Sequence, residues 1–138
     1  MADLLELYGL AEEHGTDVYW FDLGTAESLS MLQSDGSCAT AMDPWRMPTL
    51  ADEKVKLAHE LGHCETGSFY NRWATCDIRQ KHERRANRCA YKKLVPEHEL
   101  WKAIRYGYQE PWELAEYFNV TEPFLRGALS YYRMAAGL

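Results

Sequence analysis

The sequence predicts an α+β domain in which a small antiparallel sheet packs on a long helix. Three short β-prone segments, separated by turn residues, lie between residues 17 and 42. From residue 49 onward, apolar residues recur at helical spacing between capping residues, glycines and prolines. At 138 residues, the chain is long enough to bury one sizeable core.

The first elements are predicted from their patterns and their ends. Apolar residues at mixed helical spacing predict a helix over residues 3–14, closed by Gly15. Strands are predicted at 17–23, 28–32 and 38–42, and their turn-length connections favour an antiparallel meander. The third strand, with the sequence CATAM, is expected at an edge of the sheet.

The next helix has the clearest boundaries in the chain. Thr49, with Asp52 three residues later, predicts a capping box at its start. Thr66 and Gly67 predict its end.

Helices are also predicted at 78–94 and 97–106. The tail predicts two more around a tight turn at Asn119, an arrangement that resembles a helix-turn-helix. We therefore expect a domain over residues 1–108 and a helical tail over 109–138 that packs on it.

Composition restricts the class of protein. The chain has no run of eighteen apolar residues, so it predicts no membrane span. Its acidic, amphipathic start is unlike a secretory signal, and we expect a cytoplasmic protein. In that compartment the four cysteines are expected as free thiols. The sequence has no C-x-x-C pair, so a zinc site built from cysteines is not expected.

Charge is unevenly distributed along the chain. Residues 1–66 have a net charge of −10, residues 67–108 one of +6 and residues 109–138 one of −2. We interpret the basic block as the solvated face of a helix, with a docking surface for an acidic partner as the alternative. The acidic tail holds only Arg126 and Arg133 as bases, so nucleic acid is not an expected partner.

The helix after Thr49 contains the motif His59-Glu60-Leu-Gly-His63. Residues four apart share one face of a helix, so both histidines can direct a ring nitrogen at one zinc ion. Glu60 is rotated away from the helix face that carries the two histidines, so it would lie beside the ion as a general base. The alternative is a pair of surface histidines that bind nothing.

A catalytic zinc site needs a third protein ligand and an open position. Four downstream side chains could supply the ligand: Cys76, Asp77, His82 and Glu83. Glu83 shares the inward side of its helix with Ala86 and Ala90, whereas His82 is turned about 100° away. We prefer Glu83, with His82 as second choice. The alternative for Glu83 is a surface ion pair with an arginine.

An oxyanion that forms at such a site needs a hydrogen-bond donor. Tyr70, Tyr91 and Tyr106 are candidates, and the sequence does not select one of them. Packing in the core is the commoner role of a tyrosine.

Two segments, LADEKVKLAHELGHCETGSFY and HERRANRCAYKKLVP, resemble the ImmA/IrrE family of zinc metallopeptidases. The family pattern is an H-E-x-x-H helix followed by an E-x-x-A-N/D segment that ends in Leu-x-Pro. The resemblance implies a zincin-like fold, His59, His63 and Glu83 as zinc ligands, and Glu60 as base. One departure is Cys89, where the family often has phenylalanine.

The resemblance also implies a function. Members from phages and conjugative elements act as antirepressors, which cleave the transcriptional repressor of their element, and the short chain resembles that branch. A scissile segment would add as a strand to the edge at residues 38–42. The rival hypotheses are a zinc-stabilised protein that binds a repressor without cleaving it and a DNA-binding regulator.

Overall fold

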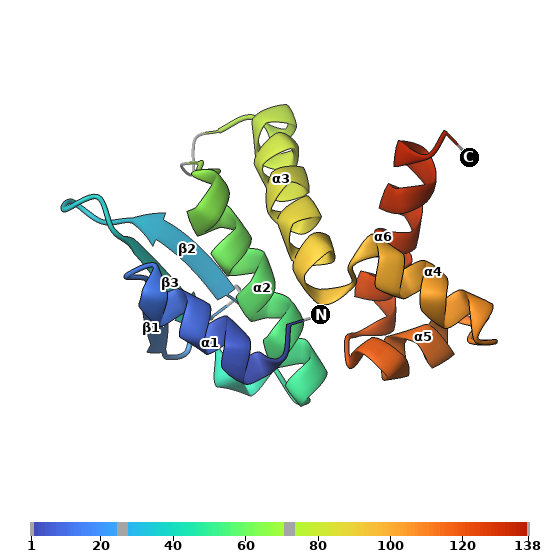
Figure 1. Cartoon of the computed structure of the whole chain (residues 1–138). Coiled ribbons are helices and arrows are strands. Elements are labelled where there is room, and N and C mark those ends of the chain that lie inside the picture. Colours follow the sequence, from blue (N-terminus) through green and yellow to red (C-terminus); the bar gives the residue numbers. More distant parts are fainter. Residues whose placement is uncertain (1, 25–27, 71–73, 138) are drawn as a thin grey trace.

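The computed structural model describes residues 2–24, 28–70 and 74–137 (Figure 1). Within these ranges the chain forms an α+β fold with six α-helices, one short 3-10 helix and a three-stranded sheet. The sheet lies at one end of the molecule, the C-terminal helices lie at the other, and helices α2 and α3 stand between them (Figure 1). The α+β class predicted from the sequence is therefore confirmed.

The sheet differs in topology from the prediction. Its strands are β1 (Asp17–Trp20), β2 (Ser28–Leu32) and β3 (Cys38–Met42), in the spatial order β1-β3-β2. β3 pairs antiparallel with β2 but parallel with β1, so the sheet is mixed and the predicted antiparallel meander is wrong.

The prediction that residues 38–42 form an edge is also wrong, because β3 is the central strand. Ala39, Thr40 and Met42 are buried, as befits a strand with a neighbour on each side. β1 is largely exposed and lies at one edge, and β2 lies at the other.

Helix α2 (Leu50–Thr66) begins and ends where its capping residues predict. Thr49 and Asp52 form the reciprocal capping box, and Gly67 ends the helix with a left-handed φ of 64°. Gly62 allows close contact with the next helix, because an added Cβ would lie 2.6 Å from the carbonyl oxygen of Ala86. That close approach sets the spacing between α2 and α3.

The remaining helices follow with short connections. They are α3 (Cys76–Leu94), α4 (Glu97–Arg105), α5 (Pro111–Phe118) and α6 (Glu122–Ala135). Asn119 turns the chain between α5 and α6 with a φ of 54°, and Thr121 caps α6, as predicted. The division at residues 108 and 109 and a helix-turn-helix role of the tail stay predictions.

One buried core joins the N-terminal elements to the tail. Its largest fully buried apolar side chains are Leu7, Met42, Leu57, Leu61, Leu94, Leu100, Leu114, Phe118 and Leu125. A polar contact adds to it: the buried ammonium of Lys54 on α2 donates a hydrogen bond to the carbonyl oxygen of Phe118 at the end of α5, at 2.8 Å.

Helix α1 (Leu4–Glu13) and a disulfide complete the N-terminal part. Cys38 of β3 and Cys64 of α2 are joined by a disulfide, so the prediction that all four cysteines are free is wrong for this pair. Sequence spacing alone gives no sign that β3 and α2 lie side by side. Cys76 and Cys89 are free, as predicted.

No helix in the described residues combines the length and hydropathy that a membrane span requires. The expected cytoplasmic location stays a prediction, and the disulfide does not favour it, because disulfides are rare in that compartment.

Candidate metal centre

Two helices bring the predicted ligands together. α2 carries His59 and His63, and α3 carries Glu83 on the side that faces α2. His59 Nε2 lies 2.7 Å from Glu83 Oε2, and His63 Nε2 lies 3.2 Å from Glu83 Oε1. The two Nε2 atoms are 3.2 Å apart. Among the described residues, only these three side chains form a group of potential ligands close enough to hold one metal ion.

The outward ring nitrogens explain why the inward ones are free to bind. His59 Nδ1 lies 2.8 Å from the side-chain oxygen of Asn87, and His63 Nδ1 contacts the carbonyl oxygen of Ser68. Both oxygens accept hydrogen bonds, so each Nδ1 carries the proton in a neutral ring. Each Nε2 then presents a lone pair, and hydrogen bonds of this kind orient histidine ligands in metal sites.

The donor set therefore fits a metal ion. Two nitrogen lone pairs and a carboxylate converge on one point, and without a cation or a proton between them they would repel one another. Two histidines and one carboxylate from protein are the ligands of many catalytic zinc sites, with the fourth position left to water or substrate.

Electrostatics keep Glu83 ionised. Burial raises the pKa of its carboxyl group, but the contacts with His59 and His63, whose Nε2 atoms donate only when those rings are protonated and no metal is bound, and the hydrogen bond from Tyr70 outweigh this and hold the pKa well below its usual value. Burial likewise lowers the pKa of His63, and the bonds to Glu83 and to the Ser68 carbonyl oxygen more than reverse it. The cluster thus attracts positive charge.

Glu60 lies outside the ligand group but in the same cavity. Its side chain is buried, and one carboxylate oxygen accepts a hydrogen bond from the hydroxyl of Ser30 on β2 at 2.9 Å. A cavity of about 220 Å³ adjoins the site. It is lined by Leu29, Ser30, Glu60, His63, Ser68, Phe69, Tyr70 and Glu83. Glu60 can therefore meet a water molecule or a peptide held in that space.

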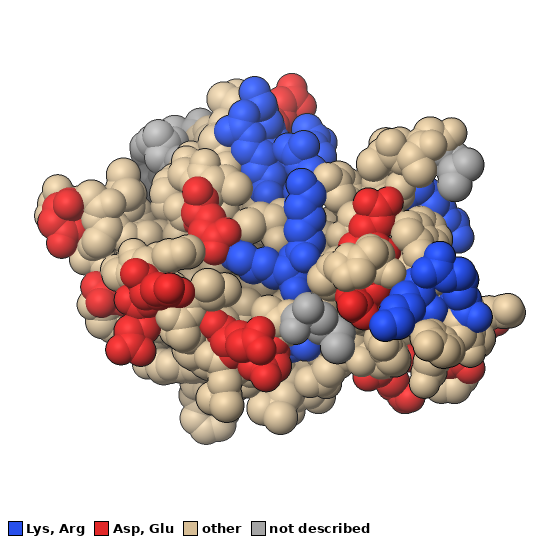
Figure 2. All heavy atoms as spheres, in the orientation of Figure 1, with Lys and Arg blue, Asp and Glu red and all other residues tan. Residues whose placement is uncertain are grey.

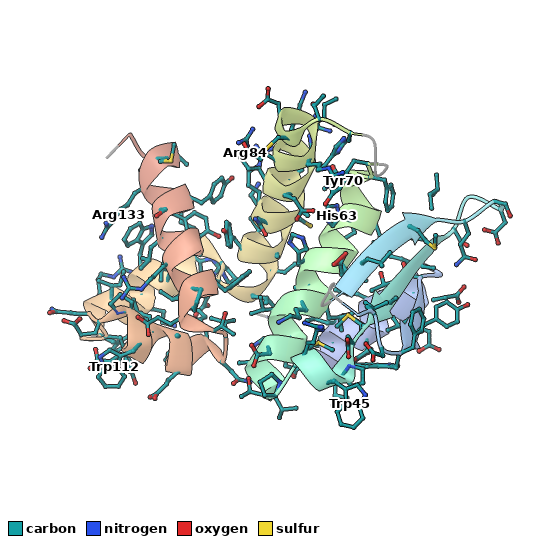
Figure 3. The ribbon with its side chains drawn as sticks, turned by 180° about the vertical axis from the view of Figure 1, so that it is seen from behind. Trp45, His63, Tyr70, Arg84, Trp112 and Arg133 are labelled. Atoms are coloured by element: carbon teal, nitrogen blue, oxygen red, sulfur yellow. A yellow bond between two sulfur atoms is a disulfide. The ribbon has the colours of Figure 1, made fainter. Side chains whose placement is uncertain are left out.

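Of the three candidate tyrosines, Tyr70 lies at the site. Its hydroxyl donates a hydrogen bond to Glu83 at 2.8 Å, and Figure 3 shows it close to His63 near the end of α2. Burial and this bond raise its pKa to about 12, so it keeps its proton at neutral pH. Tyr91 packs against Phe124, and Tyr106 is exposed, so neither shares the cavity.

The alternative ligands lie elsewhere. The ring of His82 stacks on Tyr70, with 6.0 Å between centroids, and does not join the ligand group. Cys76 and Asp77 are exposed at the start of α3. The ion pair that the sequence offered as the alternative for Glu83 is instead with the two histidines.

Three supporting residues were not predicted. Asn87 follows Glu83 by one helical turn, and that spacing is a signal that could have identified it. Ser30 faces α2 because side chains alternate along β2, but the strand order had to be known first. The Ser68 carbonyl belongs to a loop, and nothing in the sequence indicates its direction.

The surface charge follows the sequence blocks. Figure 2 shows lysine and arginine side chains gathered over α3, with acidic side chains over the N-terminal elements. The most exposed members on α3 include Lys81, Arg84, Arg88 and Lys92. Docking of an acidic partner there stays a prediction.

The helix pair with its His, His and Glu cluster has the form of a metallopeptidase site. A family model of the IrrE N-terminal-like domain (Peptidase_M78) matches residues 48–130, which include α2, α3 and most of the tail. The chain therefore belongs to the ImmA/IrrE family, whose members are of metallopeptidase type. No curated protein and no solved structure matches the chain.

Proposed function

We propose that the protein is a zinc-dependent endopeptidase that cleaves one specific protein, a transcriptional repressor of a phage or mobile element. The observation that carries the catalytic part is the convergence of His59, His63 and Glu83 beside a cavity that Glu60 enters. The family membership supports the same class of reaction. The choice of a repressor as the substrate rests on the resemblance to antirepressors of phages and conjugative elements.

The proposed roles follow from the positions of the side chains. His59, His63 and Glu83 would hold the ion, which when bound supplies Lewis-acid activation of water and of the substrate carbonyl. Glu60 accepts a proton from the attacking water and passes it to the amine that leaves. Ser30 orients the Glu60 carboxylate through its hydrogen bond. Tyr70, whose hydroxyl donates to Glu83 in the metal-free structure, would turn its O–H to the oxyanion.

The strand order changes the proposed route of the substrate. β3 is paired on both sides, so strand addition there is excluded, whereas β2 pairs on one side only within the described residues. Leu29 and Ser30 of β2 line the cavity of the cluster. An extended peptide beside β2 would therefore pass its carbonyl groups close to Glu60.

The test uses the zinc-loaded protein and a repressor encoded beside its gene. Glu60→Gln should retain stoichiometric zinc and lose cleavage by at least about a hundredfold, because it removes only the general base. His63→Ala should lose both zinc and cleavage, and the exposed His98→Ala should lose neither. Mass spectrometry of the co-expressed repressor would detect the fragments, and metal analysis would measure the zinc.

The outcomes separate the proposal from its rival. Cleavage by Glu60→Gln at the wild-type rate would remove Glu60 from its role. A chain that inactivates the repressor equally well with Glu60 or Gln, without fragments, would be the zinc-stabilised binding protein instead.

A further inference from the structure

The outer face of the sheet carries uncovered apolar side chains. Side chains alternate along a strand, so residues opposite one another in the register share a face. Ser30 and Thr40 are paired and contact Glu60 and Cys64 on the α2 side. Leu29 is paired with Ala41, and Met31 with Ala39, so these residues point away from α2. Tyr19 is paired with Ala41 from the other side and joins them.

The large members of this face are exposed. The exposed fractions are 50% for Tyr19, 52% for Phe21, 40% for Leu29 and 56% for Met31. Together with Gln33, Ala39, Thr40 and Ala41 they line a hollow of about 290 Å³. We call these eight residues the outer-face hollow. Contiguous exposed apolar surface of this kind commonly marks a binding site.

The outer-face hollow is continuous with the proposed active site. Leu29 lines both the hollow and the cavity that contains Glu60, His63 and Glu83. The two spaces lie on opposite faces of the sheet and meet at β2, one of the two edge strands of the described sheet. A polypeptide that runs along β2 would reach the cavity and the β2 side of the hollow, at Leu29 and Met31.

We propose that the β2 side of the outer-face hollow, at Leu29 and Met31, binds large apolar side chains of the protein substrate, at positions that alternate with those that enter the metal cavity. This inference rests on the proposed function. In a strand beside β2, successive side chains point to opposite faces, so one set faces the cluster and the other overlies Leu29 and Met31. The hollow thereby selects substrates with aromatic or aliphatic residues at every second position near the scissile bond.

The test measures binding and cleavage separately. The probe is a peptide library made by tryptic digestion of a bacterial lysate. Zinc-loaded Glu60→Gln protein is immobilised, and the retained peptides are sequenced by mass spectrometry. The same library is incubated with the wild type, and the new termini are identified. Met31→Thr removes one apolar contact, and Met134→Thr is the matched control, since Met134 is 79% exposed on α6. Phe21→Thr is a second control, because Phe21 follows β1 and lies roughly 14 Å from a strand beside β2, beyond the reach of that strand's side chains.

We expect the retained peptides to carry large apolar residues at alternate positions. Met31→Thr should reduce retention of those peptides by about fivefold to tenfold, as loss of a half-buried apolar contact predicts, and Phe21→Thr and Met134→Thr should not. Equal retention by Met31→Thr and Met134→Thr, or retained peptides without the alternation, would overturn the inference.

The two proposals fail in different ways. Cleavage by Met31→Thr at the wild-type rate and with the wild-type sequence preference would leave the peptidase intact and remove the role of the hollow. Patterned retention would support the hollow even if no library peptide is cut, whereas failure of the wild type to cut the co-expressed repressor would remove the peptidase. A dimer that Met31→Thr dissociates, detected by light scattering, would show that a second copy of the chain covers this face and would overturn the substrate assignment.

Discussion

Gly62→Ala tests whether the contact between α2 and α3 sets the geometry of the metal centre. The added Cβ would lie 2.6 Å from the carbonyl oxygen of Ala86 and 3.1 Å from its Cα, whereas ordinary contact begins at 3.4 Å. These are backbone atoms, so α3 must retreat by roughly 0.8 Å to relieve the overlap. Glu83 lies one turn before Ala86 and would move with it.

Two opposing terms determine the stability of this variant. Overpacking costs about 1–3 kcal/mol, and replacing a helical glycine by alanine gains about 1 kcal/mol, so we expect a net loss of roughly 1 kcal/mol. The expected effect on the zinc affinity is larger. Ligand distances in metal sites tolerate only about 0.2 Å, so the displaced carboxylate should weaken zinc binding by at least about tenfold.

Urea unfolding measures the stability, and competition with a chromophoric chelator measures the zinc affinity. Gly9→Ala is the matched control, because Gly9 lies inside α1 and an added Cβ there meets nothing within 4 Å. It should gain up to about 1 kcal/mol and leave zinc binding unchanged. If Gly62→Ala behaved like Gly9→Ala in both assays, the close approach of the two helices would not be what positions Glu83.

Three further predictions follow from the site and the disulfide. Asn87→Ala should weaken zinc binding by about 10-fold to 100-fold, measured by chelator competition, because His59 loses the partner that orients it; unchanged affinity would dismiss that role. In the metal-free protein, the lowered pKa of Glu83 means that the folded state binds fewer protons, so stability should be lost as pH falls below 4.5. Urea unfolding across acidic pH should show this slope in the wild type and a shallower one in Glu83→Gln. Reduction of the disulfide, which joins residues 26 apart, should lower the free energy of unfolding by about 3.5 kcal/mol, and Cys76→Ser with its disulfide intact should not; equal stability of the oxidised and reduced forms would contradict this.

Features encoded by neighbouring residues were predictable from the sequence. The capping box at Thr49, the stop at Gly67 and the turn at Asn119 each depend on residues within one helical turn, and the structure confirms them. The approach of Glu83 to the histidines was also accessible. It follows from helical periodicity, because the inward side of α3 is marked by Ala86 and Ala90.

Features that depend on distant segments were not predictable. The strand order β1-β3-β2 depends on how residues 38–42 insert between two earlier strands, and turn-length connections favoured the wrong neighbour. The Cys38–Cys64 pair depends on the same packing of β3 on α2. The hydrogen-bond partners of the two histidine rings come from a loop and from the next helix, and both lie outside the H-E-x-x-H motif.

The hydrogen bonds that the two Nδ1 atoms donate determine how the metal-free protein behaves. Asn87 and the Ser68 carbonyl hold both imidazoles in position with protein atoms alone. The histidine ligands are therefore preorganised, and metal binding does not have to order them. When the metal is scarce, the protein would stay folded but inactive, and it would regain activity when the metal binds again.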